Sequence, residues 1–170
     1  MTPRPVGLPR LVYLAHVSTF TFSKRSRTAL ETCHPDLQLI LAETLRRSPV
    51  DFIVTEGYRT RERQYRLFKK GLSRVDGRTR VGKHNVSPSM AADVAVYAAD
   101  KEMRRRVLYD PVHLAVVVGV AFAVAHDLLE RGLVTHALRS GGNWDRDGVF
   151  VFDQSLIDLP HLELVAADSD

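Results

Sequence analysis

The sequence predicts a small α+β domain in which an antiparallel-rich sheet is flanked by helices. The chain has 170 residues, a one-domain length that is sufficient for one sizeable core. Short runs rich in β-branched residues alternate with longer segments in which apolar residues recur at helical spacing. Because no internal repeat, low-complexity tract or linker divides the sequence, we expect a single compact domain.

Two helices are predicted within residues 23–47. Ser26 or Thr28 can cap the first helix, and Pro35 separates it from the second. After Pro35 the apolar residues recur at intervals of three and four, which favours a helix with one buried face.

The next element is a short β-rich run at residues 51–56, which ends at Gly57. Thr60 is expected to cap a helix over residues 61–70. Arg59 therefore lies just past a strand end, a position where binding and catalytic residues are often found.

On the helix at residues 61–70, Gln64 shares a face with Leu67 and Phe68. This spacing predicts that Gln64 lies near Arg59 and that the two apolar residues pack inward.

The second half of the chain supplies a loop, two strands and a core helix. Residues 71–91 lack periodicity and form a long loop, which we interpret as functional because it contains His84. A central strand is predicted at residues 93–97 and another strand at residues 134–138. Between them, residues 111–131 form a buried helix whose C-cap is Gly132.

Two metal-ligand candidates lie where this loop leads into the predicted strand, one in the loop and one at the start of the strand. An imidazole at His84 and a carboxylate at Asp93 suit zinc, which takes three protein ligands when it is catalytic. The best third ligand is His161, which follows Pro160 and opens an alternating strand pattern. Asp158 can place a second carboxylate close to the metal without being a ligand.

Four motifs in sequence order resemble those of a known enzyme family: GYRTRERQ (57–64), HNVSPSMAAD (84–93), GGNWD (141–145) and DLPHLEL (158–164). They are similar to the zinc peptidoglycan peptidases, which comprise L-alanyl-D-glutamate endopeptidases, including phage endolysins, and D-Ala-D-Ala carboxypeptidases and dipeptidases. The resemblance covers roughly residues 22–164 and is strongest to the endolysin-type endopeptidases. It implies a Hedgehog/D-Ala-D-Ala peptidase-like fold with one zinc site in a cleft.

The resemblance assigns one Zn²⁺ to His84, Asp93 and His161. Two neutral imidazoles and one carboxylate leave the ion with a positive charge and an open position, which suits the activation of water. Asp158 matches the acid/base carboxylate of the family, which takes a proton and later returns it to the leaving amine.

Arg59 is expected to bind a substrate carboxylate or the oxyanion that develops on the attacked carbonyl, because its guanidinium stays charged. Further substrate contacts are predicted for three residues: Gln64, Trp144 and Ser89.

Each of these residues also has an ordinary structural interpretation. His84 can be a simple loop histidine, His161 a core histidine and Asp93 a turn cap, while Asp158 can serve only to form a turn. Arg59 can instead pair with a neighbouring carboxylate, either Glu56 or Glu62. The order of the four motifs favours the catalytic interpretation. The remaining histidines are expected to be structural or exposed: His16, His34, His113, His126 and His136.

Composition restricts the partners. The single Cys33 excludes an intramolecular disulfide and a cysteine-rich zinc site. The formal net charge of +4 is scattered over short clusters, and no nucleic-acid-binding motif accompanies it. The resemblance implies peptidoglycan stem peptides as substrate. We expect no nucleic-acid partner, no stable membrane insertion and a monomer.

We predict an N-terminal extension at residues 1–21, a zinc peptidase domain at 22–165 and a tail at 166–170. A signal peptide is not expected, so the protein would be made in the cytoplasm and reach the wall after release, as a phage or prophage product. The predicted activity is hydrolysis of the L-alanyl-D-glutamate bond. The alternatives are a D-Ala-D-Ala carboxypeptidase or dipeptidase, a catalytically silent wall-binding or virion structural module, and a basic nucleic-acid-binding protein.

Overall fold

A four-stranded antiparallel sheet forms the centre of the protein, in the computed structural model that describes residues 18–147 and 156–167. The strands are β1 (Phe52–Glu56), β2 (Ala91–Val96), β3 (His136–Gly141) and β4 (Asp158–Ala166). Their spatial order is β1-β2-β4-β3, so the C-terminal strand lies between β2 and β3. The predicted α+β class with an antiparallel sheet is confirmed.

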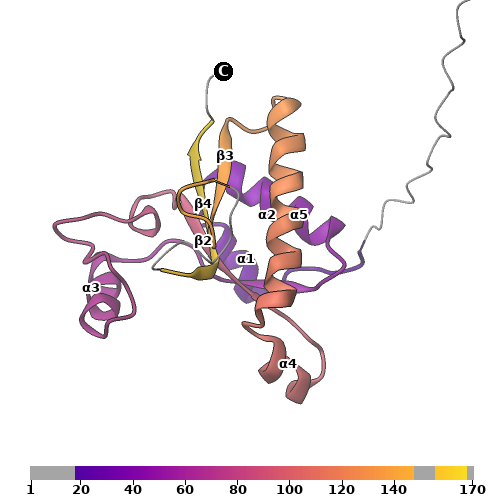
Figure 1. Ribbon diagram of the computed structural model, residues 1–170, viewed down its shortest axis with the longest axis horizontal. Helices are drawn as coiled ribbons and strands as arrows, with labels where there is room; N and C mark the ends of the chain where they lie inside the picture. Colours follow the sequence, from indigo (N-terminus) through magenta and orange to yellow (C-terminus); the bar gives the residue numbers. More distant parts are fainter. Residues whose placement is uncertain (1–17, 148–155, 168–170) are drawn as a thin grey trace, which may run out of the picture.

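One face of the sheet carries the hydrophobic core. Helices α2 (Pro35–Arg47) and α5 (Pro111–Glu130) cover this face, and α5 runs beside the strands in Figure 1. Alternate strand residues point toward these helices, because side chains in a strand alternate between its two faces. The fully buried strand residues of this core include Phe52, Val54, Ala92, Val94, Leu162 and Leu164.

The opposite face of the sheet carries polar side chains. Helix α3 (Arg61–Lys69) and the loop after it extend on this side, away from α5 (Figure 1). The loop leads into a short 3₁₀ helix, η1 (Lys83–Asn85), and then into β2. Asp93 and His161 have the strand parity opposite to that of the core residues, so they face this polar side.

Helix α5 is the longest helix of the described residues and, by its length and apolar composition alone, could cross a membrane. In this structure one of its faces is packed into the core through residues at helical spacing: Leu114, Val117, Val118, Ala121, Val124, Ala125 and Leu128. Gly132 follows its end with a φ of 66°, as the predicted cap requires. The expectation of no stable membrane insertion stays a prediction.

Helix α1 (Lys24–Leu30) begins earlier than the sequence suggested. Ser23 is the N-cap, and its hydroxyl accepts a hydrogen bond from the Ser26 amide at 3.2 Å. The predicted caps at Ser26 and Thr28 are therefore wrong, because both residues lie inside the helix. The second predicted helix is confirmed as α2, with His34 as its N-cap.

Helix α4 (Lys101–Val107) was not predicted. Asp100 caps it, but none of its residues is buried. A helix without a buried apolar face leaves no periodic signal in the sequence.

Two smaller expectations differ from the structure. The strand predicted at residues 134–138 begins at His136 and continues to Gly141, where its pairing with β4 ends at Asp158. Phe68 is 40% exposed rather than packed inward, because α3 extends beyond the sheet (Figure 1).

Candidate metal centre

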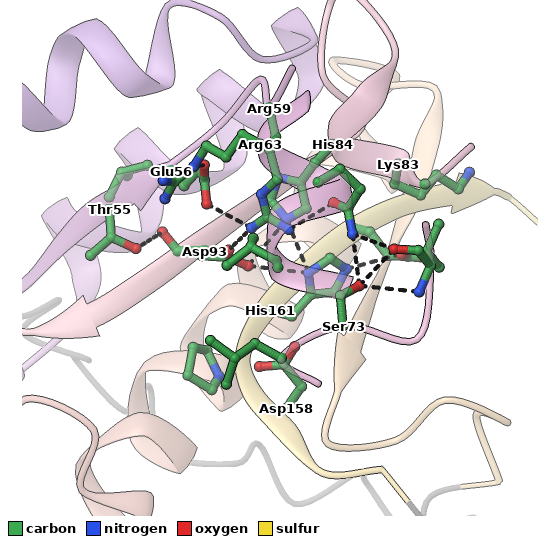
Figure 2. Close-up of a pocket in the computed structure, with 18 of the residues that line it drawn as sticks. Thr55, Glu56, Arg59, Arg63, Ser73, Lys83, His84, Asp93, Asp158 and His161 are labelled. Carbon is green, nitrogen blue, oxygen red and sulfur yellow. Dashed lines mark hydrogen bonds and ion pairs between the residues drawn. The ribbon is translucent and has the colours of Figure 1, made fainter. Parts of the chain in front are cut away.

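Three ligand atoms from separate elements form a compact triangle. His84 comes from η1, Asp93 from β2 and His161 from β4, and Figure 2 shows the three side chains pointing toward one another. His84 Nε2 lies 3.1 Å from Asp93 Oδ1 and 3.2 Å from His161 Nδ1, and the His161 Nδ1 to Asp93 Oδ1 distance is 3.2 Å. Ligands about 2.0–2.1 Å from a tetrahedral zinc lie roughly 3.3 Å apart, so this triangle fits zinc.

The backbone orients the His84 ring. Its Nδ1 donates to the carbonyl oxygen of Gly57, at the end of β1, with a distance of 2.6 Å. Donation from Nδ1 leaves the lone pair of a neutral ring on Nε2, the atom that faces Asp93 and His161. His84 is only 5% exposed, so this orientation is held by packing as well as by the hydrogen bond.

A buried carboxylate orients the His161 ring. His161 pairs directly opposite Asp93 in the β2–β4 ladder, and its Nε2 donates to Glu163 Oε2 at 3.0 Å. Arg139, opposite Glu163 on β3, holds the other carboxylate oxygen through two nitrogens. His161 therefore directs Nδ1 toward the triangle, in the carboxylate–histidine arrangement common at zinc sites.

Sequence reasoning missed Glu163 and Arg139. The available signal was strand parity, since Glu163 follows His161 by two residues and must lie on the same face of β4. The arginine partner depends on the register between β3 and β4, which no local pattern specifies.

The electrostatics of the triangle favour a positive charge. Burial alone would raise the pKa of Asp93, but its close contacts with the His161 and His84 rings lower it well below its usual range. Burial would likewise lower the pKa of His161, yet Asp93 and Glu163 raise it to about 9. The same surroundings that favour a proton also favour a metal cation.

Arg59 lies directly behind Asp93. Its Nη2 donates to Asp93 Oδ2 at 2.8 Å and to Glu56 Oε2 at 2.6 Å. Its Nε is buried and has no hydrogen-bond partner among the described residues. Arg59 thus orients the carboxylate of a ligand candidate, and the pair with Glu56 that was considered for it is present.

Gln64 is close to Arg59, as predicted. Its Oε1 accepts from Arg59 Nη1 at 3.0 Å, while its Nε2 donates to Ser73 Oγ and to the Val75 carbonyl, both at 2.7 Å. The side chain is 3% exposed. In this structure Gln64 ties the loop after α3 to Arg59, and its amide protons are both used within the protein.

Asp158 lies in the cleft at the start of β4, near His161 (Figure 2). No described residue donates a hydrogen bond to its carboxylate. Burial, followed by the neighbouring negative charge of Asp93, raises the pKa of Asp158 above its usual range. A partly buried carboxylate of this kind can both accept and donate a proton.

Trp144 lines the cleft next to His161. Its ring lies 5.3 Å from the His161 ring, and its Nε1 donates to the Leu156 carbonyl at 3.0 Å. Its backbone carbonyl accepts from Arg139. The residue therefore lies beside the ligand triangle, just after the Gly-Gly pair of the third motif.

Ser89 is not brought to the cleft. It is fully buried, and its hydroxyl donates to the Ala91 carbonyl at 2.7 Å and accepts from the Ala91 amide at 3.2 Å. These bonds shape the backbone that enters β2, so the structure gives Ser89 a supporting position below the site.

The cleft around the triangle has a volume of about 1590 Å³. Its lining contains four carboxylates: Glu56, Asp93, Asp158 and Glu163. Basic residues are more numerous in its lining: Arg25, Arg59, Arg63, Arg74, Arg80, Lys83 and Arg139.

The family model described as phage L-alanyl-D-glutamate peptidase matches residues 18–165. The chain belongs to this family. The match spans all four motifs on which the resemblance was based, so the predicted relationship is confirmed. A comparison with curated proteins found no match.

Among solved structures, this phage L-alanyl-D-glutamate peptidase family member is similar to the Serratia marcescens L-Ala D-Glu endopeptidase ChiX. The identity is 24%, the TM-score is 0.63, and the match covers 85% of this chain and 90% of ChiX. At this identity the likeness establishes the shared fold.

Proposed function

We propose that the protein is a zinc-dependent endopeptidase that hydrolyses the L-alanyl-D-glutamate bond of peptidoglycan stem peptides. The main support is the near-equilateral triangle of His84, Asp93 and His161 beside the carboxylate of Asp158, which accepts no hydrogen bond from the described residues. A triangle of this size suits zinc, and the neighbouring carboxylate supplies the base that hydrolysis needs. Membership of a peptidase family supports the same conclusion.

His84 Nε2, His161 Nδ1 and Asp93 Oδ1 are the atoms that would hold the metal. A bound zinc supplies Lewis acidity, which polarises the scissile carbonyl and makes water a better nucleophile near neutral pH. Glu163 and the Gly57 carbonyl keep both rings in the tautomer with a lone pair toward the ion.

Asp158 acts as the general base. Its carboxylate accepts a proton from the attacking water and then donates that proton to the nitrogen of the leaving D-glutamate residue. A pKa above the usual range suits this exchange, because a more basic carboxylate accepts the proton of the attacking water more readily.

Substrate recognition depends on charge. Stem peptides carry free carboxylates, and Arg74, Arg80 and Lys83 line the cleft beside the triangle. Arg59 contributes the positive charge of its guanidinium beside Asp93, and Trp144 offers an apolar wall for the peptide. Gln64 holds the loop after α3, which carries Arg74 and Arg80 into the cleft lining.

The proposed activity also implies that the enzyme acts at the cell wall. The enzyme reaches the cell wall after release from the cytoplasm, as a phage or prophage product, and acts as a monomer. The proposed domain is residues 22–165, with residues 1–21 as an extension and 166–170 as a tail. Most of the extension and part of the tail lie outside the described residues.

The test is mass spectrometry of peptidoglycan digested by the zinc-loaded protein and by an Asp158→Asn variant. We expect the wild type to release fragments with a new N-terminal D-glutamate, and the variant to be slower by at least about 100-fold. The variant should retain its zinc, because Asp158 lies outside the ligand triangle. Asp127→Asn, on the surface of α5, makes the same chemical change far from the cleft and should keep full activity.

Other products would identify the alternatives. Release of free D-alanine or of D-Ala-D-Ala would identify a carboxypeptidase or dipeptidase. Zinc binding without any cleavage would identify a catalytically silent wall-binding or virion structural module. Tight DNA binding without cleavage would revive the nucleic-acid alternative.

A further inference from the structure

A second group of metal-ligating side chains lies far from the cleft along β3. His136 is the first residue of β3 and pairs with Ala166, whereas Gly141, at the other end of the strand, pairs with Asp158. His34 caps α2 and Asp36 lies in the first turn of that helix. The group therefore joins a helix of the core layer to one end of the sheet.

The distances in this group are those of a ligand set. His136 Nδ1 lies 2.8 Å from Asp36 Oδ2, and His34 Nδ1 lies 3.7 Å from Asp36 Oδ1. The two distances, measured to different oxygens of Asp36, lie on either side of the roughly 3.3 Å expected between the ligands of a tetrahedral zinc. One ligand atom from each of the three residues lies within 4.8 Å of the others.

The group is also organised in advance. Asp36 Oδ2 accepts from the amides of Thr135 and His136 at 2.9 and 3.1 Å, which fixes the carboxylate plane. His34 Nδ1 accepts from the Asp36 amide at 3.2 Å, which holds the His34 ring next to the carboxylate. Partners that orient a ligand in this way are typical of built metal sites.

Other histidines of the chain make simpler contacts. His113 pairs with Asp110, and His126 pairs with Glu130, each within one helix. Among the described residues, three metal-ligating side chains lie within ligand distance of one another in two clusters. One cluster is the cleft triangle and the other is this group. His34 and His136 were expected to be merely structural or exposed, so this juxtaposition is a finding of the tertiary structure.

We propose that His34, Asp36 and His136 form a second, structural site for a borderline divalent cation such as Zn²⁺, which fastens α2 to the start of β3. Two imidazoles and one carboxylate are ligands that such cations prefer. The cation would replace the proton between His136 Nδ1 and Asp36. The side chains of His34, Asp36 and His136 are 26%, 13% and 27% exposed, so solvent can supply the ion and complete its coordination.

This site is independent of the proposed hydrolysis, and the experiment separates the two. The full-length protein is stripped with a chelator and titrated with zinc, and bound metal is counted after dialysis against micromolar free zinc. Wild type should bind two ions per chain. His34→Asn, which keeps an acceptor for the helix cap, and His136→Gln should each bind one and retain peptidoglycan cleavage.

His126→Gln is the matched control, because it removes an exposed histidine on α5 and should leave two ions bound. Asp93→Asn, which weakens the cleft triangle, should still bind one ion, and adding His136→Gln to it should abolish this binding. Circular dichroism checks that each variant is folded.

The proposal is overturned if wild type binds a single ion that Asp93→Asn removes and His136→Gln does not. Two ions in the folded His34→Asn and His136→Gln variants would overturn it equally. If no ion binds to wild type, both this site and the proposed catalytic zinc are rejected, whereas a single ion lost only with His136→Gln would support this site and reject zinc in the cleft.

Discussion

Each histidine of the ligand triangle is oriented by a partner on its far ring nitrogen. His84 uses a backbone carbonyl, while His161 uses the carboxylate of Glu163. Glu163 is 4% exposed, and burial alone would raise its pKa, but hydrogen bonds from His161 and Arg139 lower it. Glu163 therefore stays ionised next to the ring, which makes His161 a more basic ligand.

This arrangement predicts the effect of Glu163→Gln. The amide keeps the shape of the side chain but removes its charge, so we expect zinc affinity to fall about 10- to 100-fold. The measurement is a competition titration with a chromophoric chelator, with Glu130→Gln on the exposed surface of α5 as control. An unchanged affinity, in a folded variant, would mean that Glu163 only fills space.

The lone cysteine gives a prediction about reactivity. Cys33 is 1% exposed, and burial raises its pKa from 9.0 to about 11. At pH 8 its thiolate fraction should be about 100-fold lower than that of a free thiol, so native protein should resist alkylation. Mass spectrometry after iodoacetamide treatment tests this, with urea-unfolded protein as the reactive control.

The raised pKa of Cys33 also makes the free energy of unfolding depend on pH. Because the folded state holds the thiol proton more tightly, the free energy of unfolding should fall as pH rises from about 9 to about 11. Replacing Cys33 with Ala should remove that part of the alkaline destabilisation. Rapid native labelling at pH 8 would contradict both expectations.

At the scale of elements, the turn after β1 brings the cleft together. Gly57 ends this strand, its carbonyl holds His84, and the next residues lead through Arg59 into α3. A Cβ atom at Gly57 would lie 2.4 Å from the Ala29 carbonyl oxygen and 2.7 Å from Cys33 Sγ. The turn therefore packs against the end of α1 too closely for any side chain.

Gly57→Ala should destabilise the protein by about 1–3 kcal/mol or more, because backbone atoms must move to admit the methyl group. Gly119→Ala is the matched control. Gly119 lies in α5 with nothing within 4 Å of the added Cβ, so alanine should stabilise that helix by about 0.5–1 kcal/mol. Urea denaturation measures both variants, and a neutral Gly57→Ala would show that the turn can relax.

Elements with a buried periodic face were predictable from the sequence, and those without one were not. The buried positions of α5 and the apolar run of β1 both gave clear signals. Helix α4 buries nothing and gave no signal. The ligand candidates were found by the order of motifs, whereas the links from Arg139 to Glu163 and from Asp36 to His136 depend on tertiary pairing.

At the scale of the whole molecule, the sheet separates an apolar core from a charged cleft. In β4, Leu162 and Leu164 face the helices while His161 and Glu163 face the cleft. All four are less than 9% exposed. Both faces of this strand are therefore buried, so the polar groups of the cleft depend on one another for compensation of their charges.

Removing the metal should consequently lower global stability. At a zinc concentration about 1,000 times the dissociation constant, binding to the folded state adds about 4 kcal/mol to the free energy of unfolding. We expect chelator-treated protein to melt at lower temperature, to lose activity, and to recover both with zinc. Asp158→Asn should show the same thermal shift without activity, and an identical melting curve with and without chelator would contradict the proposal.

The pairing of Asp93 with His161 also affects how the chain reaches its native state. A slip of one residue between β2 and β4 would bring Leu162 opposite Asp93 and turn His161 toward the core. Such misaligned chains would have no complete triangle and could not gain the binding energy of the metal. Under the proposed zinc chemistry, only chains with the native register of β2 and β4 can bind the metal. A zinc-bound enzyme molecule is therefore one whose two central strands are correctly aligned.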